Sequence, residues 1–441
     1  MKTISLLFAL LIAACPPLVA SEAAFFWRTE VFRQGNGGVH TYRIPALIET
    51  QKGVLIAVAD ARHDSNRDLP ARISLVMRRS VDGGKHWEPA RTIREVNEGG
   101  VGDASLLLDR SNGRVWCFHN YGPPGIGFQT AKPGARTGPT TLQFQAIHSD
   151  DDGATWSEAI DFTPQVKDPS WQAMFSTSGT DIQISSGRFL VPLVMRDAQG
   201  IIHSLNAYSD DHGKTWNRGE PIGKGTDESH NVELQGGIIL QNMRNGRTRA
   251  IASSHDGGVF FGPVSHDPAL IDPGCNAGIT RYHSAGKDIL VFTNAASTRR
   301  ENLTVKLSYD GGRTWPVARV IDAGPAGYST VIPLHDGTIG VLYERGETNA
   351  AERIAFARFN LAWVTESRRQ NAPGLRNRGR VPVEHCRGLL RQASLPASIP
   401  RRSSSPCALV RLKPNRSPHR SSPPKSSDIA VPVWEGRTSG R

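Results

Sequence analysis

Short runs of alternating apolar and polar residues recur along the chain between about residues 25 and 365. Residues 73–77 (Ile-Ser-Leu-Val-Met) and 303–307 (Leu-Thr-Val-Lys-Leu) are clear examples, and each ends at a cluster of Ser, Asp and Gly. Alternation with a period of two residues, followed by turn-forming residues, predicts β-strands joined by tight turns. The pattern therefore predicts one all-β domain from Phe25 to about Thr365.

The turns that follow these strands carry a repeated motif, Ser-x-Asp-x-Gly-x-x-Trp. A weaker copy from Ser254 ends in Phe261 instead of Trp. Asp side chains accept hydrogen bonds from nearby backbone N–H groups and Gly supplies a positive φ, which suits a tight hairpin. Repetition every 45 to 69 residues predicts the blades of a β-propeller. The four complete copies begin at Ser80, Ser149, Ser209 and Ser308.

The carboxylates of these motifs are expected to be structural. Each one is needed within its own turn, so we do not expect Asp82, Asp151, Asp211 or Asp310 to take part in chemistry.

Charge is concentrated at the C-terminal end. The chain has 441 residues and a formal net charge of +11, and residues 366–441 hold 16 Lys+Arg against 4 Asp+Glu. The other residues carry 36 basic and 37 acidic side chains and are almost neutral. The end segment is rich in Ser, Pro and Arg and lacks apolar periodicity, which predicts a disordered tail over 366–441. Because the basic charge belongs to this segment and not to the β domain, we expect no nucleic-acid partner.

Residues 1–23 have the features of a secretory signal. Lys2 precedes an apolar stretch from Ile4 to Ala14, and small residues follow. Ile12-Ala13-Ala14-Cys15 also resembles the bacterial lipoprotein box, so a lipid anchor at Cys15 is the alternative to simple cleavage. We expect a secreted, periplasmic or outer-surface protein without a transmembrane segment, because no other apolar run is long enough.

Several motifs of other chemistries do not occur in the sequence. There is no CxxC pair, zinc-ligand spacing, HExxH, Walker loop or GxGxxG after a strand. We therefore expect no metal, no organic cofactor and no disulfide framework, with Cys117 and Cys275 as buried thiols. No coiled-coil seam is present, and we expect a monomer.

The segment Tyr42-Arg43-Ile44-Pro45-Ala46-Leu47, together with the repeats behind it, resembles bacterial exo-α-sialidases (neuraminidases) of glycoside hydrolase family 33. The resemblance covers residues 25 to 365. It implies a six-bladed β-propeller that removes terminal sialic acids from glycoproteins, glycolipids such as gangliosides, and oligosaccharides, with retention of configuration and no cofactor. The residues of an acyl pocket, in segments such as Trp116–Phe128 or Trp171–Phe175, are left open.

The resemblance implies three arginines that bind the substrate carboxylate. A guanidinium group presents a planar pair of donors that matches the two carboxylate oxygens. Arg43 is the first by its Arg-Ile-Pro context, and Arg244 in Leu240–Arg244 resembles the second. Arg300 resembles the third, with Arg299 as the alternative.

The resemblance implies Tyr328, in Ala326-Gly327-Tyr328-Ser329-Thr330, as the nucleophile. Sialidases use Tyr where other glycosidases use a carboxylate. A neutral phenol can approach the anionic substrate without repulsion, but its ordinary pKa of about 10 requires a base. The family segment implies Glu228 as that base, and the nearby Glu233 is interpreted as structural.

Three further residues complete the expected site. Asp68 resembles the family's general acid/base, with Asp64 as its competitor. Arg62 resembles an additional pocket arginine, and Glu344 resembles the carboxylate that orients Arg43. An ordinary surface salt bridge is the alternative for Arg62 and for Glu344.

Two other functions fit much of the same pattern. A trans-sialidase would use the same residues with a sugar hydroxyl in place of water. A non-catalytic propeller could bind sialic acid without cleaving it, although binding alone does not require Tyr, Glu and Asp together. The complete set favours the hydrolase.

Overall fold

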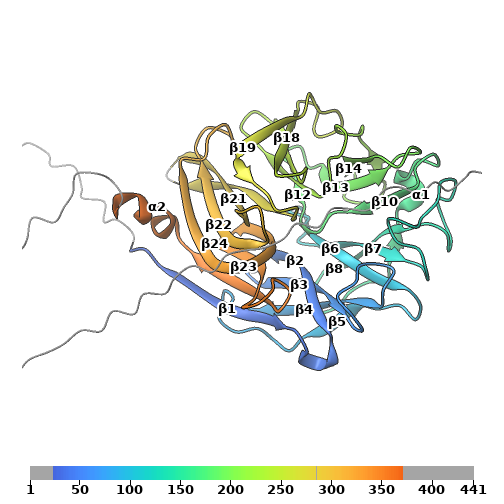
Figure 1. Cartoon of the computed structure of the whole chain (residues 1–441), viewed down its shortest axis with the longest axis horizontal. Coiled ribbons are helices and arrows are strands. Elements are labelled where there is room, and N and C mark those ends of the chain that lie inside the picture. The colour runs from blue at the N-terminus through green and yellow to red at the C-terminus, as the bar shows by residue number, and fades with distance from the viewer. Residues whose placement is uncertain (1–22, 285, 371–441) are drawn as a thin grey trace, which may run out of the picture. The chain divides into compact units, whose positions relative to one another are not determined.

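The computed structural model describes residues 23–284 and 286–370, and strands dominate this range (Figure 1). Five sheets follow one another in chain order, apart from the N-terminal strand and the short strand β11 (Gly179–Thr180). The sequence of colours in Figure 1, from blue through green to orange, passes from each sheet to the next around a common centre. The all-β prediction is confirmed. The helical elements of this range are η1 (Asn36–Gly38), α1 (Thr163–Val166) and α2 (Leu361–Gln370).

The sheets are built mainly from consecutive antiparallel strands, so most strand pairs are local hairpins. In the first sheet Thr41 lies opposite Arg62, and Arg62 lies opposite Ile73. The first strands of successive sheets also contact each other. Examples are the contacts of β2 (Thr41–Glu49) with β6 (Gly100–Leu108) and of β16 (Ser229–Glu233) with β20 (Gly278–Ser284). The first sheet comprises β2 (Thr41–Glu49), β3 (Leu55–Arg62), β4 (Ile73–Ser80) and β5 (Arg91–Arg94).

The next three sheets repeat this arrangement with small additions. The second contains β6 (Gly100–Leu108), β7 (Val115–Gly122), β8 (Gln143–Ser149), β9 (Ile160–Asp161) and β11 (Gly179–Thr180), the last pairing parallel to β6. The third contains β10 (Ala173–Ser176), β12 (Ile182–Gln183), β13 (Phe189–Arg196), β14 (Ile202–Ser209) and β15 (Asn217–Arg218). The fourth contains β16 (Ser229–Glu233), β17 (Ile239–Met243), β18 (Thr248–Ser254) and β19 (Ser265–Ile271).

The fifth sheet has seven strands because its long strand β23 (Val317–Pro333) changes partner along its length. Its first half pairs with β22, and its second half, from Ala326, pairs with β24. The N-terminal strand β1 pairs antiparallel with β25, which joins the two ends of the described domain. The remaining strands are β20 (Gly278–Ser284), β21 (Lys287–Ala295), β22 (Glu301–Ser308), β24 (Ile339–Arg345), β25 (Arg353–Phe359) and β1 (Phe26–Arg33).

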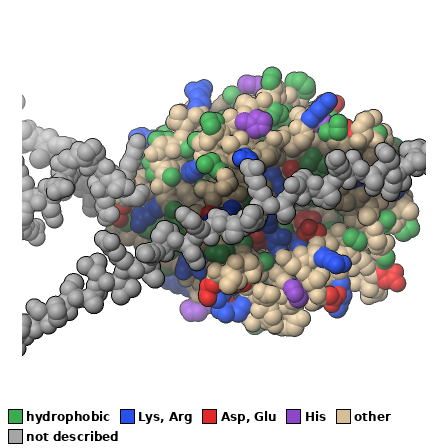
Figure 2. Space-filling model, viewed as in Figure 1, with side chains coloured by type: hydrophobic (Ala, Val, Ile, Leu, Met, Phe, Trp, Pro, Cys, Tyr) green, Lys and Arg blue, Asp and Glu red, His purple; other side chains and the backbone are tan. Residues whose placement is uncertain are grey.

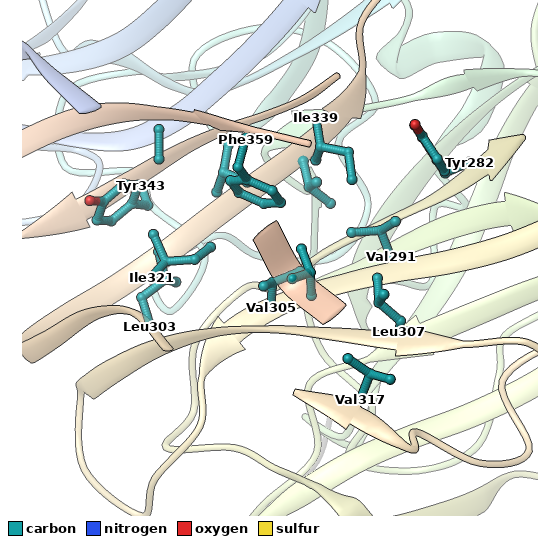
Figure 3. Packing of buried hydrophobic residues seen from close by; sticks show 14 of the residues in the cluster. Tyr282, Val291, Leu303, Val305, Leu307, Val317, Ile321, Ile339, Tyr343 and Phe359 are labelled. Carbon is teal, nitrogen blue, oxygen red and sulfur yellow. The ribbon is translucent and has the colours of Figure 1, made fainter. Parts of the chain in front are cut away.

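Apolar side chains from β20 to β25 form a large buried cluster (Figure 3). Val305 and Leu307 are fully buried and alternate with more polar neighbours along β22, as the sequence pattern predicts. Ile339 and Phe359 approach them from β24 and β25. Burial of such side chains contributes about 1.5–3 kcal/mol each, so the packing of the sheets holds the domain together.

The repeated Ser-x-Asp-x-Gly motifs form one type of turn in all five copies. In the first, Asp82 Oδ1 accepts the Ser80 hydroxyl at 2.8 Å and the backbone N–H of His86 at 3.0 Å, and Ser80 Oγ accepts Gly84 N–H at 2.8 Å. The same bonds from the glycine to the serine recur in the other copies. Gly84 has a φ of 92°, which favours glycine. In the four complete copies the Asp carboxylate therefore accepts the backbone N–H four residues on.

The domain ends in α2, so the expected boundary at residue 365 falls inside a helix. Trp363, in its first turn, stacks on Phe26 with ring centroids 4.5 Å apart and also contacts Phe359. These contacts hold the first turn of α2 against the fifth sheet. The helix continues for five residues beyond Thr365. The signal segment, Cys15 and residues 371–441 lie outside the described residues.

The surface charge, the helices and the cysteines of the described residues can be compared with the sequence predictions. On the face in Figure 2, Lys and Arg side chains are interspersed with Asp and Glu. No helix within residues 23–284 and 286–370 is long and apolar enough to cross a bilayer. Cys117 and Cys275 are free and buried, as expected.

Candidate active site

The expected site residues lie at one edge of the sheets. The first strand of each sheet starts at this edge and the second strand returns to it, because neighbouring strands are antiparallel. The repeated Asp turns follow the third strands and therefore lie at the opposite edge, as Ser80 opposite Leu55 illustrates. Residues at the site edge are Arg43, Arg62, Asp68, Glu228, Arg244, Arg300, Tyr328 and Glu344.

The Glu344 carboxylate is the centre of one group. Its two oxygens accept Arg43 Nε at 2.9 Å and Arg43 Nη2 at 3.0 Å, a bidentate pair. The same oxygens accept the backbone N–H groups of Ile44 and Tyr328, both at 3.0 Å. These four bonds outweigh burial and lower the pKa of Glu344. A Cβ on Gly327 would lie 2.2 Å from Glu344 Oε2, so only glycine fits there.

The Arg-Ile-Pro motif at residues 43–45 interrupts the regular pairing of β2 with β3. The pairing of β2 with β3 shifts between Arg43 and Ala46, and Ile44 has a φ of 61°. A positive φ is an outlier for a β-branched residue. Pro45 has no N–H to donate to a ladder, and the Ile44 N–H is donated to Glu344. The motif thus produces a local bulge that directs Arg43 and Ile44 onto Glu344.

Glu228 and Arg244 face each other across a hairpin. Ser229 pairs with Met243, and backbone bonds from Arg244 N to Glu228 O and from Asp227 N to Arg244 O extend the pairing by one step. The 16-residue spacing of Glu228 and Arg244 therefore follows from the register of β16 and β17. Glu233 lies at the other end of β16, where it accepts bonds from Ser185, and not in this group.

Tyr328, Glu228 and Arg244 share one hydrogen-bonded cluster. The Tyr328 hydroxyl donates to Glu228 Oε2 at 2.5 Å. Arg244 Nη1 donates to the same oxygen at 2.7 Å and to the Tyr328 hydroxyl at 3.1 Å. Burial, together with the neighbouring carboxylate of Glu228, raises the pKa of Tyr328 well above its usual value. Burial and Asp227 also raise the pKa of Glu228. The phenol is therefore neutral and in contact with an acceptor for its proton.

Arg300, and not Arg299, lies beside Tyr328. The Arg300 guanidinium carbon is 5.6 Å from the centre of the Tyr328 ring, and that of Arg43 is 5.2 Å from it. Arg300 Nη2 also donates to Gly274 O at 3.0 Å. The Arg299 side chain is 80% exposed and pairs with Glu301. Arg43, Arg244 and Arg300 thus surround the tyrosine.

Asp68 lies on the loop between β3 and β4 and pairs with Arg62. Arg62 Nη2 is 2.7 Å from Asp68 Oδ1 and 3.4 Å from Asp60 Oδ2. Arg62 is 1% exposed and Asp68 is 82% exposed, so a buried cation holds an accessible carboxylate. Asp64 is instead 3.9 Å from Arg72 on the outside of the loop. Arg62 is therefore not a surface salt-bridge residue.

Sequence analysis missed Asp60 and Asp103. Asp60 Oδ1 accepts the backbone N–H of Asp103 at 2.9 Å. Burial raises the pKa of Asp60 to about 6 despite Arg62. Burial and the adjacent Asp60 raise the pKa of Asp103 well above its usual value. Asp103 has a φ of 58°, and the only signal in the sequence was a polar residue within the apolar run of β6.

A cavity of about 510 Å³ brings Asp68, Asp103, Glu228, Arg244 and Tyr328 together. Its size is typical of small-molecule sites. One wall is apolar and includes the edge-to-face rings of Phe128 and Phe175, 4.9 Å apart at their centroids.

The described residues offer no metal centre at this cavity or elsewhere. No three His, Cys, Asp or Glu side chains in residues 23–284 and 286–370 are grouped to hold an ion. The charged and phenolic groups of the cavity are instead Tyr328, four carboxylates and Arg244. Arg43 and Arg300, beside the Tyr328 ring, add the positive charge that suits an anionic substrate.

Comparisons with known proteins agree on one family. Residues 101–341, more than half of the chain, match the BNR repeat-like domain family. A sialidase from Micromonospora viridifaciens is 39% identical over 75% of this chain and 53% of its own length. A sialidase from Bacteroides fragilis is 35% identical over 70% of this chain and 61% of its own length. This chain thus spans only about half to three-fifths of these relatives.

A solved structure gives the same result. The Hadza microbial sialidase Hz136 superposes with a TM-score of 0.71 and 34% identity, over 75% of this chain and 68% of that chain. The protein is therefore a member of the sialidase family, with a BNR repeat-like domain.

Proposed function

We propose that this protein is a retaining exo-α-sialidase that hydrolyses terminal sialic acids from glycans. The hydrogen bond of 2.5 Å from the Tyr328 hydroxyl to Glu228, amid three arginines, carries the proposal. A phenol paired with a buried carboxylate is an activated nucleophile, and the arginines supply positive charge where the substrate has its carboxylate. A sugar-binding site would need the arginines but not this pair.

The arginines Arg43, Arg244 and Arg300 bind the carboxylate on the anomeric carbon. Arg43 is itself held by Glu344, and this ion pair outweighs burial and keeps the pKa of Arg43 above its ordinary value. Glu344 fixes both the guanidinium of Arg43 and the backbone of Tyr328. The same carboxylate therefore positions a carboxylate-binding arginine and the nucleophile relative to each other.

The reaction proceeds in two displacements. Tyr328 attacks the anomeric carbon and passes its proton to Glu228, while Asp68 protonates the departing glycosidic oxygen. The bond from the anomeric carbon to the leaving oxygen breaks as the bond to the Tyr328 oxygen forms. Asp68 then takes a proton from water, the water oxygen displaces the tyrosine, and Glu228 returns the proton to the phenolate.

The cavity also supports a role in recognising the rest of the sugar. Asp103 supplies a buried carboxyl group for a ring hydroxyl, and the wall with Phe128 and Phe175 suits the methyl group of an acylamino substituent. The substrates are then sialylated glycoproteins, glycolipids and oligosaccharides. No step calls for a metal or an organic cofactor.

The test is release of 4-methylumbelliferone from its α-sialoside by the full chain. Tyr328→Phe and Glu228→Gln should each lower kcat by about 100-fold or more, as expected for loss of the nucleophile or its base. Tyr282→Phe is the matched control, since its hydroxyl donates to Gly337 O away from the cavity. A Tyr328→Phe protein that keeps most of its turnover would exclude this mechanism.

Transfer to a sugar acceptor is the alternative within the same chemistry. Sialic acid would then pass from Tyr328 to a hydroxyl of added lactose instead of water. Measuring the ratio of sialyllactose to free sialic acid distinguishes the two reactions. Folded wild-type protein without either activity would instead favour a sialic-acid-binding propeller.

We also propose six blades for the propeller. The partner change in β23 supports this count, because its two halves complete a sheet with β20–β22 and another with β24, β25 and β1. Pairing of β1 with β25 would close the ring. Export through a signal over residues 1–23, a lipid anchor at Cys15 as the alternative, and a monomeric state are proposals as well.

A further inference from the structure

The weaker copy of the Asp turn differs from the complete copies in the residue that follows its Asp by four positions. In three complete copies this residue is a Thr whose hydroxyl donates to Oδ2 of the Asp at 2.6 to 2.7 Å, and these residues are Thr155, Thr215 and Thr314. Phe260 stands at this position in the weaker copy. A phenyl ring has no donor group, so Oδ2 of Asp256 lacks the side-chain partner that its counterparts have.

The substitution leaves an aromatic ring and a carboxylate oxygen available in one turn. Phe260 is 63% exposed. Among the described residues, only the Phe260 N–H donates to Asp256 Oδ2, at 3.2 Å, whereas Oδ1 also accepts the Ser254 hydroxyl at 2.6 Å. The hydrogen bonds to Asp256 outweigh burial and lower its pKa, so the carboxylate is ionised near neutral pH.

Phe260 and Asp256 line a cavity of about 570 Å³, a size typical of small-molecule sites. Ser253 on β18 and Ser265 on β19 add hydroxyl groups to its walls, and the exposed His255 adds a ring nitrogen. Among the described residues that line this cavity there is no Lys or Arg. The lining therefore suits a ligand with hydroxyl groups and an apolar face, and it does not suit an anion.

The third sheet holds this turn in place before a ligand arrives. Arg188 Nη1 donates to the backbone oxygens of Asp256 at 3.3 Å and Gly257 at 3.2 Å. On the other side of the turn, Val259 O accepts the backbone N–H of Glu220 at 2.8 Å. Because the backbone is fixed on both sides, little conformational entropy is lost when a ligand binds.

We propose that this cavity is a carbohydrate-binding site for a neutral hexose unit of a glycan. One face of a pyranose ring presents C–H groups, which pack on the exposed ring of Phe260. The hydroxyl groups at the edge of the sugar donate to Asp256 Oδ2 in charge-assisted hydrogen bonds. The hydroxyls of Ser253 and Ser265 provide further partners.

The proposed site lies at the edge of the sheets opposite the catalytic cavity. Ser254, which begins the turn, pairs with Ile239 at the start of β17, whereas Arg244 directly follows the other end of β17. A hexose in this cavity therefore takes no part in the reaction. It gives the protein a second attachment point on glycans, and the inference does not depend on the function proposed above.

The test is a titration of the full chain with methyl β-galactoside, followed by NMR of labelled isoleucine methyl groups. Ile251 lines the proposed site, and Ile44 and Ile202 line the catalytic cavity, so their signals distinguish the two places. The Ile251 signal should shift with a Kd of about 1–10 mM, as expected for a small ligand with few contacts.

Phe260→Thr restores the sequence of the complete copies. The new hydroxyl can donate to Asp256 as Thr155 donates to Asp151, so the turn should remain folded. The Kd at the Ile251 signal should rise about tenfold or more with loss of the ring, while kcat and KM for the 4-methylumbelliferyl sialoside stay unchanged. Val81→Thr is the matched control, because Val81 is a 72% exposed apolar residue of the first copy.

Three results would overturn the inference. The first is an Ile251 signal that responds to none of the methyl glycosides of galactose, glucose and mannose. The second is unchanged sugar binding in Phe260→Thr. The third is a response to tetramethylammonium but to none of the sugars, which would assign the ring and the carboxylate to a cationic ligand. Presence or absence of sialidase activity tests only the function proposed above.

Discussion

Arg249 and Asp272 form an ion pair in which neither side chain is exposed, with Arg249 Nη1 2.9 Å from Asp272 Oδ2. Arg249 also donates to Asn242 Oδ1 and to Cys275 O. Asp272 Oδ1 accepts the backbone N–H groups of Gly274 at 3.2 Å and Cys275 at 3.1 Å. The pair thus anchors the segment that leads into β20.

This anchored segment supports two residues of the site. Gly274 O receives a hydrogen bond from Arg300, and the Cys275 side chain packs in a buried cluster with Ile44 and Tyr328. The ion pair touches no expected substrate atom. Its effect on catalysis would be exerted through the positions of Arg300 and Tyr328.

We predict that Asp272→Asn destabilises the fold and weakens substrate binding. Removing one partner of a buried pair leaves an uncompensated charge and costs about 3–5 kcal/mol in the free energy of unfolding. KM should rise several-fold because Arg300 loses its fixed support. Urea titration and steady-state kinetics measure the two effects.

Asp288→Asn is the control for this prediction. Its partner Arg281 is about one-third exposed, and such a pair contributes about 0–1 kcal/mol. Asp272→Asn protein with wild-type KM would show that the pair supports stability alone.

Glu344→Gln should lower kcat/KM about 10- to 100-fold. The substitution keeps the shape but removes the charge that holds Arg43, and an amide cannot accept at both oxygen positions. Loss of alignment of Arg43 should appear mainly as a higher KM. Hydrolysis of the 4-methylumbelliferyl sialoside measures it.

Glu88→Gln provides a matched comparison for Glu344→Gln. Arg79 and Glu88 form the same bidentate geometry at 3.0 and 3.1 Å, but the Glu88 side chain is 40% exposed and distant from the cavity. Its substitution should leave KM unchanged. Equal effects of the two substitutions would contradict a special role for Glu344.

Stability should depend on pH through Asp60, whose pKa burial raises to about 6. Between about pH 4 and 6 an unfolded Asp loses its proton while folded Asp60 keeps it, so this contribution falls as pH rises through that window. Relative to Asp60→Asn, wild-type stability should therefore drop by roughly 2 kcal/mol from pH 4 to pH 7. The charged residues near the Asp60 carboxyl group affect the size of this change in stability, and they include Arg62, Asp68 and Asp103.

Chemical denaturation of both proteins at intervals of one pH unit measures this difference. Asp64→Asn serves as the control, because Asp64 is 70% exposed on the same loop region. Parallel stability curves for wild type and Asp60→Asn would show that Asp60 does not titrate in this window.

The repeated Asp turns should contribute to stability without affecting catalysis. Asp151 accepts the hydroxyl and backbone N–H of Thr155 at 2.7 and 2.8 Å, and these bonds help to lower its pKa to about 2. Asp151→Ala should reduce the free energy of unfolding by about 1–2 kcal/mol. Folded variant protein should keep wild-type kcat and KM, since the turn lies at the edge opposite the cavity. A changed KM would indicate coupling between the two edges.

Local sequence determined the elements that depend on neighbouring residues. The Ser-x-Asp-x-Gly turns are readable because every bond within them joins residues at most four positions apart. The spacing of Glu228 and Arg244 is likewise set within one hairpin. Arg43 and Tyr328 could be proposed because the local Arg-Ile-Pro and Gly-Tyr segments resemble a known family.

Tertiary structure decided which of these residues meet and what supports them. Arg43 contacts Glu344 across 301 positions of sequence, and only the packing of the first sheet against the last brings them together. Arg300 lies beside Tyr328, whereas Arg299 pairs with Glu301. Both residues precede β22 in an irregular segment, where a strand pattern of alternating side chains cannot show which of the two points toward Tyr328. The sequence did not reveal Asp60, Asp103 or the Arg249–Asp272 pair. A buried charged residue must find a partner, but only the folded structure shows which residues are buried and which partner each one meets.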